Sequence, residues 1–190
     1  MNRNFKFLNS FVNISEADFL KLQKISSFRR LKKKETIAIQ GEFPVREIFL
    51  LVSGVMRAYV NAESGKQFNK KIFVPTSFVG PLTSLVKNSI SGLTYEALTD
   101  CKVYSINYDD FVALCKRDII ISNLYSKILE FVFIQYEKRS IELMAMDATE
   151  RYLKLKERIP NIDDLIPQFQ IASYLSITPV QLSRIRKKLL

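Results

Sequence analysis

The front part of the chain is marked by short apolar runs that alternate with polar segments. The polar segments carry glycine at several junctions, such as Gly41, Gly54 and Gly65. Short runs of this kind, bounded by turn-forming residues, are typical of antiparallel strands in a sandwich, barrel or roll. The runs that predict strands are Thr36–Ile39, Ile48–Val52, Val55–Val60, Lys71–Val74, Tyr95–Leu98 and Lys102–Ile106.

From about Asp118 the apolar spacing changes from two to three and four. This predicts a helix from Asp118 to roughly Met144, about 40 Å long at about 1.5 Å per residue. One line of apolar and neutral positions has the spacing of a two-helix seam, and we expect it to pair two copies of the chain. The alternative is a single amphipathic helix on its own core, and apolar residues on the other faces require part of the helix to pack on the front domain. The predicted seam consists of Ile121, Leu124, Ile128, Phe131 and Gln135.

The chain up to about residue 27 has apolar spacing suited to short helices. Ser15, followed by Glu16 and Asp18, marks the start of one helix, with a buried face formed by Phe19, Leu20 and Leu22. The basic run Phe28–Lys34 follows. We interpret it as a solvated loop or the edge of a sheet in preference to an arm that binds nucleic acid.

A second helix start follows the long helix. Asp147 with Glu150 three positions later has the pattern of a capping box, which predicts a helix through Arg158 and a hinge at Ala145–Asp147. The segment Asn161–Leu165 then links to the end of the chain. These boundaries predict a sensor domain over 1–117, a dimerisation helix and hinge over 118–146, and a terminal domain over 147–190.

The last 24 residues have the pattern of two helices separated by a tight turn. Thr178 is a good N-cap, and Pro179 stands at the first helical position, where a missing N–H costs nothing. Ala172, Leu182 and Ile185 have the spacing of the core of a helix-turn-helix motif. Ser176 stands where such turns often carry glycine.

Uncompensated positive charge follows on the second of these helices. Arg184, Arg186, Lys187 and Lys188 extend from it, no acidic residue occurs after Asp164, and the whole chain has a net charge of +10. Phosphates provide much of the free energy of DNA binding, so this placement favours DNA. The alternative is ordinary helix packing, because cations also stabilise helix C-termini.

Several classes of function are disfavoured by what the chain lacks. It contains no histidine, no glycine-rich phosphate loop and no nucleophile elbow, which argues against an enzyme and against a metal site. The residues after Met1 lack the apolar region of a secretory signal, and no run of about 18 apolar residues predicts a membrane span. Together with two cysteines, Cys101 and Cys115, this leads us to expect free thiols and a cytoplasmic protein with no membrane partner.

The order of a β-rich domain, a long helix and a terminal helix-turn-helix resembles the Crp/Fnr superfamily of bacterial transcription regulators. Front-domain landmarks are Gly41-Glu42, Ile48–Gly54, Phe78–Leu82 and Glu96-Ala97, while Ala148–Leu155 and Ile171–Lys188 resemble short members from the Bacteroidetes. The resemblance implies an α+β fold, with an antiparallel β-roll or jelly-roll sensor domain of the cyclic-nucleotide-binding type. It also implies a homodimer that binds an inverted-repeat operator in double-stranded DNA, and contact with RNA polymerase if the protein is an activator.

The ligand cassette departs from the family pattern. Members that bind cyclic AMP have Phe-x-Gly-Glu, whose glutamate bonds the ribose, and an arginine some ten residues later that neutralises the phosphate. Here Pro81 replaces the glutamate, and Ser91–Tyr95 contains no cation. The sequence therefore predicts weak or no cyclic-nucleotide binding and no other cofactor, and it does not identify an effector. The candidate pocket residues are Phe78, Gly80, Pro81, Leu82, Thr83, Ser84, Ser91 and Thr94.

The resemblance also places residues on DNA. Of the three family positions that read bases, which are Pro179, Val180 and Arg184 here, only Arg184 matches, and it is the expected base reader. Gln181 and Ser183 are candidate supplementary readers. The rival hypothesis is a ligand-sensing module whose helix-turn-helix region binds protein. The residues expected to contact phosphate and set the register are Thr178, Arg186, Lys187 and Lys188, with Pro179 beside them.

Overall fold

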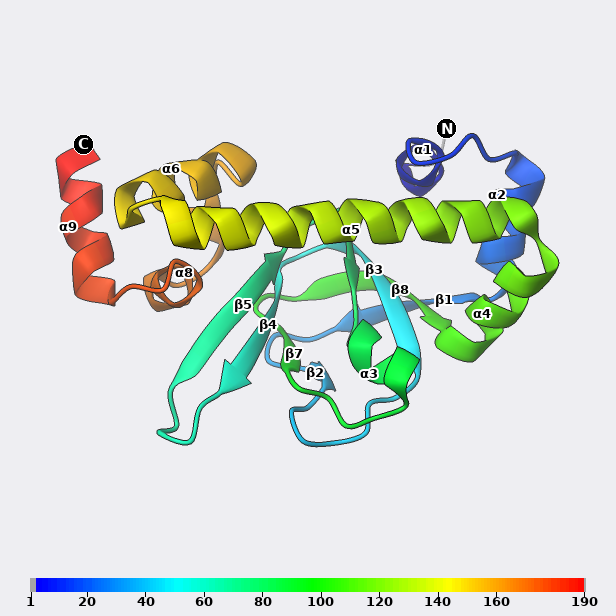
Figure 1. Ribbon diagram of the computed structural model, residues 1–190, viewed down its shortest axis with the longest axis horizontal. Coiled ribbons are helices and arrows are strands. Elements are labelled where there is room, and N and C mark those ends of the chain that lie inside the picture. Colours follow the sequence, from blue (N-terminus) through cyan, green and yellow to red (C-terminus); the bar gives the residue numbers. More distant parts are fainter. Residues whose placement is uncertain (1–2, 190) are drawn as a thin grey trace.

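A single long helix, α5 (Ile119–Ala145), runs most of the length of the molecule and organises everything else around it. The computed structural model describes residues 3–189. In Figure 1 the β-roll lies along one side of α5, the short N-terminal helices lie near one end, and the C-terminal helices gather at the other end. The order of strands, long helix and terminal helices is the α+β architecture that the sequence predicts.

The β-roll consists of two four-stranded antiparallel sheets. Their strand orders are β1-β8-β3-β6 and β2-β7-β4-β5. Every strand expected from sequence is present within a few residues of its predicted bounds; β6 was not expected, and β1 was expected only as one of two interpretations of the basic run. The strands are β1 (Ser26–Leu31), β2 (Thr36–Ala38), β3 (Glu47–Ser53), β4 (Met56–Asn61), β5 (Gln67–Phe73), β6 (Ser77–Val79), β7 (Thr94–Ala97) and β8 (Cys101–Asn107).

The inner faces of the two sheets form one core. Leu51, Met56, Ala97 and Val103 in this core are fully buried. One turn depends on glycine: Gly54 has φ +91°, and a Cβ there would lie 2.4 Å from the carbonyl oxygen of Asp100. This close approach explains why glycine, and no residue with a side chain, follows Ser53 at the end of β3.

The basic run at residues 28–34 is partly an edge strand. β1 occupies one edge of its sheet, where it pairs with β8 alone, and most of its side chains are at least partly exposed. Leu31 is the exception, with 1% of its surface exposed, and it anchors the strand in the core. The interpretation of this run as a sheet edge is therefore the better of the two offered from sequence.

The N-terminal helices α1 (Arg3–Asn9) and α2 (Glu16–Lys24) pack near the first half of α5. Ser15 begins α2 as predicted, through a capping box with Asp18. Leu22 is buried, but Leu20 is 53% exposed, so its predicted place on the buried face is wrong. The helix is only nine residues long, and its contact with the core is too narrow to cover Leu20.

Another helix, α4 (Tyr108–Arg117), comes between the roll and α5 and was not expected from sequence. Asp118 separates the two helices, because its side chain accepts bonds from the amides of Ile120 at 3.0 Å and Ile121 at 3.2 Å. The chain thus turns sharply at the predicted start of the long helix.

The face of α5 that sequence assigned to a dimer seam is mostly turned inward. Ile121, Leu124 and Ile128 are at most 9% exposed, and they pack in one cluster with Leu8 and Phe111 of the same chain. The seam prediction is wrong for these three residues, because the same spacing serves packing onto the chain's own core. Of the other two, Phe131 is 42% exposed and Gln135 is half-buried.

The C-terminal helices begin immediately after a short break at Met146 and Asp147. The predicted capping box is present: Asp147 and Glu150 bond each other's backbone amides at the start of α6 (Ala148–Arg158). The expected linker contains a short helix, α7 (Ile162–Leu165), which buries Ile162 completely. α8 (Gln168–Tyr174) and α9 (Pro179–Leu189) then form the helix-turn-helix pair.

The C-terminal helices share a hydrophobic cluster with the roll. Val55, Ile72 and Leu98 of the roll pack in the same buried cluster as Tyr152 of α6 and Leu182 of α9. The segments 1–117 and 147–190 therefore meet through a continuous apolar contact.

Candidate functional sites

The turn between α8 and α9 is held by backbone bonds that require one left-handed residue. Ser176 has φ +59°, its amide donates to the carbonyl of Ser173 at 3.2 Å, and the amide of Ile177 donates to the carbonyl of Ala172 at 3.0 Å. This is the Schellman arrangement, in which glycine is the usual residue at the position of Ser176. The turn fixes the angle at which α9 leaves α8.

The start of α9 is closed by a reciprocal cap. The Oγ1 of Thr178 accepts from the amide of Gln181 at 3.2 Å, and the Oε1 of Gln181 accepts from the amide of Thr178 at 2.9 Å. Thr178 is thus the N-cap that the sequence predicts. Because its Oε1 is engaged in the cap, Gln181 has only its amide NH₂ left to offer a base.

The inward face of the helix pair matches the prediction. Ala172 and Leu182 are fully buried, and Ile185 packs against the same cluster. The helix α8 can approach α9 closely because the small side chain of alanine occupies position 172. This packing leaves the opposite face of α9 exposed.

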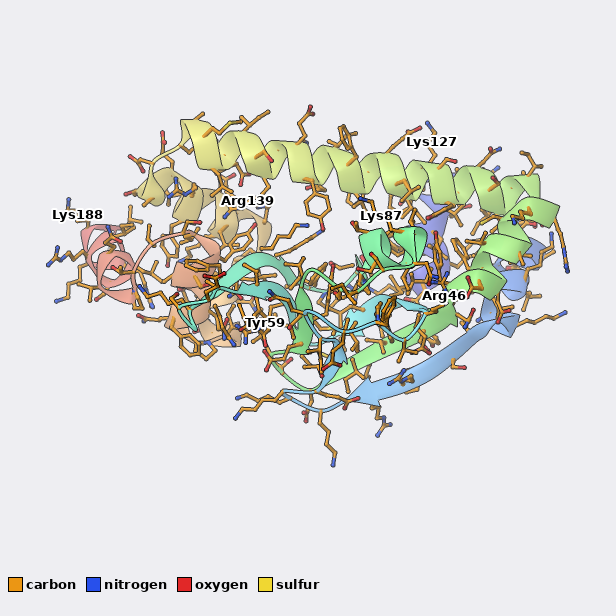
Figure 2. All side chains as sticks on the ribbon, turned by 60° about the horizontal axis from the view of Figure 1, so that its bottom comes forward. Arg46, Tyr59, Lys87, Lys127, Arg139 and Lys188 are labelled. Carbon is orange, nitrogen blue, oxygen red and sulfur yellow. The ribbon has the colours of Figure 1, made fainter. Side chains whose placement is uncertain are left out.

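The exposed face of α9 carries the charges expected to meet DNA. Val180, Arg184 and Lys187 share this face at spacings of four and three, and Lys188 stands at its edge. Within residues 3–189 neither Arg184 nor Lys187 has an ion-pair partner. In Figure 2 Lys188 lies at the extreme end of the molecule, far from Lys127 on the first half of α5. The remaining predicted residues on this helix, Pro179 and Ser183, are also exposed.

Two details of this surface were not anticipated. Arg186 turns toward the body of the domain, where its Nη1 lies 3.6 Å from the Oδ1 of Asp163. Val180 is 61% exposed and lies one turn before Arg184. Its spacing of four residues from Arg184 was the sequence pattern that could have placed it on the same helical face. An exposed aliphatic residue on such a surface can contact the methyl group of thymine.

A second candidate site is a cavity of about 260 Å³ between α5 and the roll. Four of the residues predicted for a ligand pocket line it: Phe78, Gly80, Leu82 and Thr83. Most of its other walls are apolar side chains. They include Leu8, Leu22, Phe49, Phe73, Val79, Ile106, Phe111, Leu124, Ile128, Leu129 and Val132.

The other four predicted pocket residues do not line this cavity. The Oγ of Ser84 donates to the carbonyl of Ile90 at 3.1 Å, and that of Ser91 donates to the carbonyl of Leu93 at 2.6 Å. Thr94 accepts from the amide of Gln40, and Pro81 precedes the short helix α3 (Leu82–Lys87). The hydroxyls of Ser84 and Ser91 stabilise local turns and that of Thr94 joins two distant segments of the chain, so all three bond the backbone and lie outside the lining of this cavity, where they were predicted.

The cavity does contain cations, and these were missed from sequence. Lys70 and Lys71 of β5 both line it, with their Nζ atoms 4.7 Å and 5.1 Å from the ring centroid of Tyr136 on α5. Consecutive strand residues normally point to opposite faces, but here the pairing of β4 with β5 shifts register between Ala58 and Tyr59. This bulge leaves Lys70 without an opposite residue and turns both ammonium groups toward α5.

The environment of these lysines is cationic and partly desolvated. Burial lowers the pKa of Lys70 and Lys71 below the ordinary lysine value, and Lys70 lowers the pKa of Lys71 further. No aspartate or glutamate is among the described residues that line the cavity. Among the described residues, the charge of the pair is therefore balanced by the ring faces of Tyr136 and Phe73 and by solvent.

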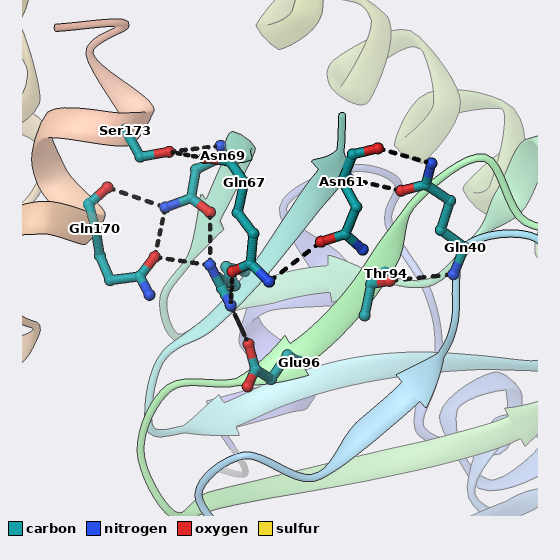
Figure 3. A network of polar contacts seen from close by, with 9 residues as sticks. Gln40, Asn61, Gln67, Asn69, Thr94, Glu96, Gln170 and Ser173 are labelled. Carbon is teal, nitrogen blue, oxygen red and sulfur yellow. Dashed lines mark hydrogen bonds and ion pairs between the residues drawn. The ribbon is translucent and has the colours of Figure 1, made fainter. Parts of the chain in front are cut away.

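A polar network ties the roll to the helix-turn-helix region (Figure 3). Arg57 of β4 is 6% exposed, and its Nη1 donates to the Oε1 of Gln170 on α8 at 3.0 Å. Its Nε donates to Glu96 at 2.7 Å. Asn69 donates to the same Gln170 oxygen at 2.7 Å, and the Oγ of Ser173 accepts from the backbone amide of Asn69 at 3.0 Å.

Among residues 3–189 no group of three or more histidine, cysteine, aspartate and glutamate side chains has the arrangement of a metal site. Within the same range, no helix is both long enough and apolar enough to span a bilayer. Cys101 and Cys115 are free thiols, and burial raises the pKa of both.

Comparison with known proteins finds a family model that matches the roll. Residues 28–118 match the family model of the cyclic nucleotide-binding domain. The chain as a whole has the fold of solved Crp/Fnr-type transcription regulators. No curated protein matches the sequence.

Solved structures with this fold align with most of the chain. FixK2 from Bradyrhizobium japonicum has a TM-score of 0.71 at 19% identity, over 87% of this chain and 84% of that one. CLP from Xanthomonas campestris, a c-di-GMP-responsive global regulator, has a TM-score of 0.70 at 14% identity, over 92% of this chain and 91% of that one. A proposed regulator of the Crp/Fnr family from Eubacterium rectale has a TM-score of 0.71 at 16% identity, over 93% of this chain and 83% of that one.

Proposed function

We propose that the protein is a dimeric, sequence-specific DNA-binding transcription regulator that acts in the cytoplasm and catalyses no reaction. The observation that supports this best is the outer face of α9, where Arg184 and Lys187 stand exposed with no acidic partner among residues 3–189. The inner face of the same helix is fixed by Leu182 and by the cap at Thr178. A rigid helix with free cations on its outer face suits the major groove.

Each side chain on this face has a distinct proposed role. Arg184 reads a guanine by two hydrogen bonds, and Val180 packs on a thymine methyl group. Lys187 and Lys188 contact phosphates and set the register. Arg186 plays a smaller part than sequence suggested, because its guanidinium is shared with Asp163.

Dimerisation would place two such helices on an inverted repeat. The surface of α5 that supports a dimer is the outward stripe over its second half. This stripe contains Phe133 at 68%, Ile134 at 44%, Ile141 at 51% and Met144 at 79% exposure, whereas in the first half the exposed positions between Ile119, at 70%, and Phe131 are polar. We propose that two copies pair through this stripe instead of the seam first expected.

Cyclic AMP is not the proposed effector. Pro81 offers no carboxylate for the ribose, and the hydroxyls of Ser84, Ser91 and Thr94 are engaged with the backbone. No described arginine is among the residues that line the cavity of about 260 Å³. DNA binding should therefore not require this nucleotide.

The first test is selection of genomic fragments by the purified protein, with and without cyclic AMP, at about 0.15 M salt because affinity depends steeply on ionic strength. We expect enrichment of one inverted repeat in both arms. Enrichment only with cyclic AMP would overturn the proposal about the effector. Failure to retain DNA, together with salt-insensitive capture of a protein partner, would favour the protein-binding alternative.

Substitutions then assign the roles on α9. Arg184→Ala should cost about 1–3 kcal/mol on the selected repeat and relax preference at one base position. Lys187→Ala should weaken binding to selected and random DNA alike and reduce the salt dependence. Lys127→Ala, at the far end of the molecule, is the matched control and should change neither. Equal losses on selected and random DNA for Arg184→Ala would remove its role as a base reader.

A further inference from the structure

The cavity beneath α5 combines an apolar interior with a cationic mouth. Its depth is lined by aromatic and aliphatic side chains such as Phe73, Phe111 and Leu124, whereas Lys70 and Lys71 stand at one side. Lys71 is half-buried and Lys70 keeps contact with solvent. A ligand that matches both regions must have an apolar body and an anionic end that stays near water.

The two lysines have no acidic partner in the described structure. Their nearest described partners are aromatic: Tyr136 lies against both ammonium groups, and Phe73 lies 5.1 Å from the Nζ of Lys71. Two neighbouring cations held together in a partly desolvated place repel each other. An anion between them would relieve that repulsion and form charge-assisted hydrogen bonds.

A second hollow of about 200 Å³ continues from the same lysines toward the DNA-binding helices. It shares Lys70, Lys71 and Tyr136 with the first cavity and is also lined by Leu155 of α6 and Tyr174 of α8. Arg139 and Arg158 line it too, and they share the single carboxylate of Glu142, at 3.4 Å and 3.1 Å, so one of their two positive charges is compensated. The lysine pair, which has no acidic partner among the described residues, carries the larger uncompensated charge at this junction.

We propose that the cavity binds an amphipathic organic acid, with its apolar chain among the side chains of the roll and α5 and its carboxylate between Lys70 and Lys71. The carboxylate would lie where the roll, α5 and the terminal helices meet. Binding would thereby bias how the helix-turn-helix region sits on the roll. The regulatory consequence rests on the proposed DNA-binding function, but the binding site itself does not.

The size of the cavity favours a chain of medium length. A volume of about 260 Å³ is just below the usual range for small-molecule pockets. Octanoate is therefore the probe, and its concentration is kept below micelle formation. Each additional buried methylene should strengthen binding about fourfold, so affinity should rise from butyrate to hexanoate to octanoate.

Calorimetric titration of the full chain with octanoate, 1-octanol, octylammonium and cyclic AMP tests the proposal. Octanoate should bind at least about tenfold more tightly than 1-octanol, since only the acid pairs with the lysines, and octylammonium should not bind. The double variant Lys70→Met, Lys71→Met should lose at least about tenfold in octanoate affinity and keep its affinity for 1-octanol. Its unfolding midpoint should be unchanged or higher, because it removes repelling cations without removing volume.

Two further variants complete the design. Lys66→Met, on the hairpin between β4 and β5, is the matched control and should bind octanoate normally. Val132→Phe narrows the cavity and should weaken octanoate more than butyrate. Equal affinity for the acid and the alcohol, unchanged octanoate binding in the double variant, or tighter competing binding of cyclic AMP would overturn the proposal.

The DNA assay separates this inference from the proposed function. Retention of the inverted repeat without any octanoate binding would refute the ligand site alone. Octanoate binding that depends on the lysines, in a protein that retains no DNA, would uphold the site and refute the DNA-binding role.

Discussion

Ser176 shows how one residue shapes the DNA-binding surface. It occupies the left-handed region, with φ +59°. Its backbone amide donates a hydrogen bond to the carbonyl of Ser173, and this bond helps to end α8. A residue with a Cβ pays about 1–2 kcal/mol to adopt this conformation, which glycine adopts freely. The turn is therefore maintained by the packing on both sides of it and by the backbone bonds.

Replacing this residue should stabilise the protein. We expect Ser176→Gly to raise the free energy of unfolding by about 1 kcal/mol, measured by urea denaturation, because it removes the left-handed strain. Ser183→Gly is the matched control in the exposed middle of α9 and should lower the same quantity by about 0.5–1 kcal/mol. A change of the same sign in both variants would contradict the assignment of strain to position 176.

At the scale of elements, α5 illustrates how one helix serves two partners. Its inward face, with Ile121 and Leu124, packs in one cluster with the N-terminal helices, α4 and the adjoining side of the roll, while its outward second half exposes Phe133 and Ile141. A helix that is apolar on more than one side must bury more than one side. The inward side is covered by the chain itself, and a second copy is the proposed cover for the other.

Charge on the outward stripe should separate the proposed dimer. Ile141→Asp introduces a carboxylate into the apolar contact, so we expect monomers at micromolar concentration by analytical ultracentrifugation, with the helical content unchanged. Lys116→Asp, on an exposed position of α4, is the matched control and should remain dimeric. Dimers of Ile141→Asp as stable as those of the unmodified chain would place the interface elsewhere.

At the scale of the whole molecule, the DNA-binding helices are docked on the sensor by apolar and polar contacts together. The Oε1 of Gln170 accepts from both Arg57 and Asn69, and Arg139 of α5 donates to the carbonyl of Tyr174. Since Arg57 and Gln170 are both buried, the bond between them satisfies polar atoms that are shielded from water on both sides of the contact. The position of α8, and with it that of α9, is therefore coupled to β4 and β5.

Removing one acceptor should loosen this docking. Gln170→Ala leaves Arg57 and Asn69 short of a buried partner, so we expect a loss of about 1–3 kcal/mol in the free energy of unfolding. Amide hydrogen exchange should become faster in α8 than in β3. Gln168→Ala, on the exposed side of the same helix, should change neither quantity. Equal protection of α8 in the two variants would show that the apolar cluster alone holds the helices.

The sequence by itself determined the features that depend on neighbouring residues. Thr178 and Asp147 start helices because their side chains reach amides two or three positions away. The strands of the roll followed from short apolar runs, and the turn at Gly54 from a glycine between two of them. Such features use contacts within a few residues, so their signals lie close together in the chain. The short helices α3 and α7 were missed because helical patterns of six and four residues are too brief to stand out. The ten-residue helix α4 was missed although Asn107 caps its start.

Only the tertiary structure decided which surfaces meet. The spacing of Ile121 and Leu124 is the same whether a helix packs on its own roll or on a partner, so the periodicity could not choose between them. Likewise, the bulge that brings Lys70 to the cavity depends on the pairing of β4 with β5, which brings together residues far apart in the chain. The apolar cavity and its cationic mouth exist because the N-terminal helices, the strands of the roll and α5 converge, and no local pattern records that convergence.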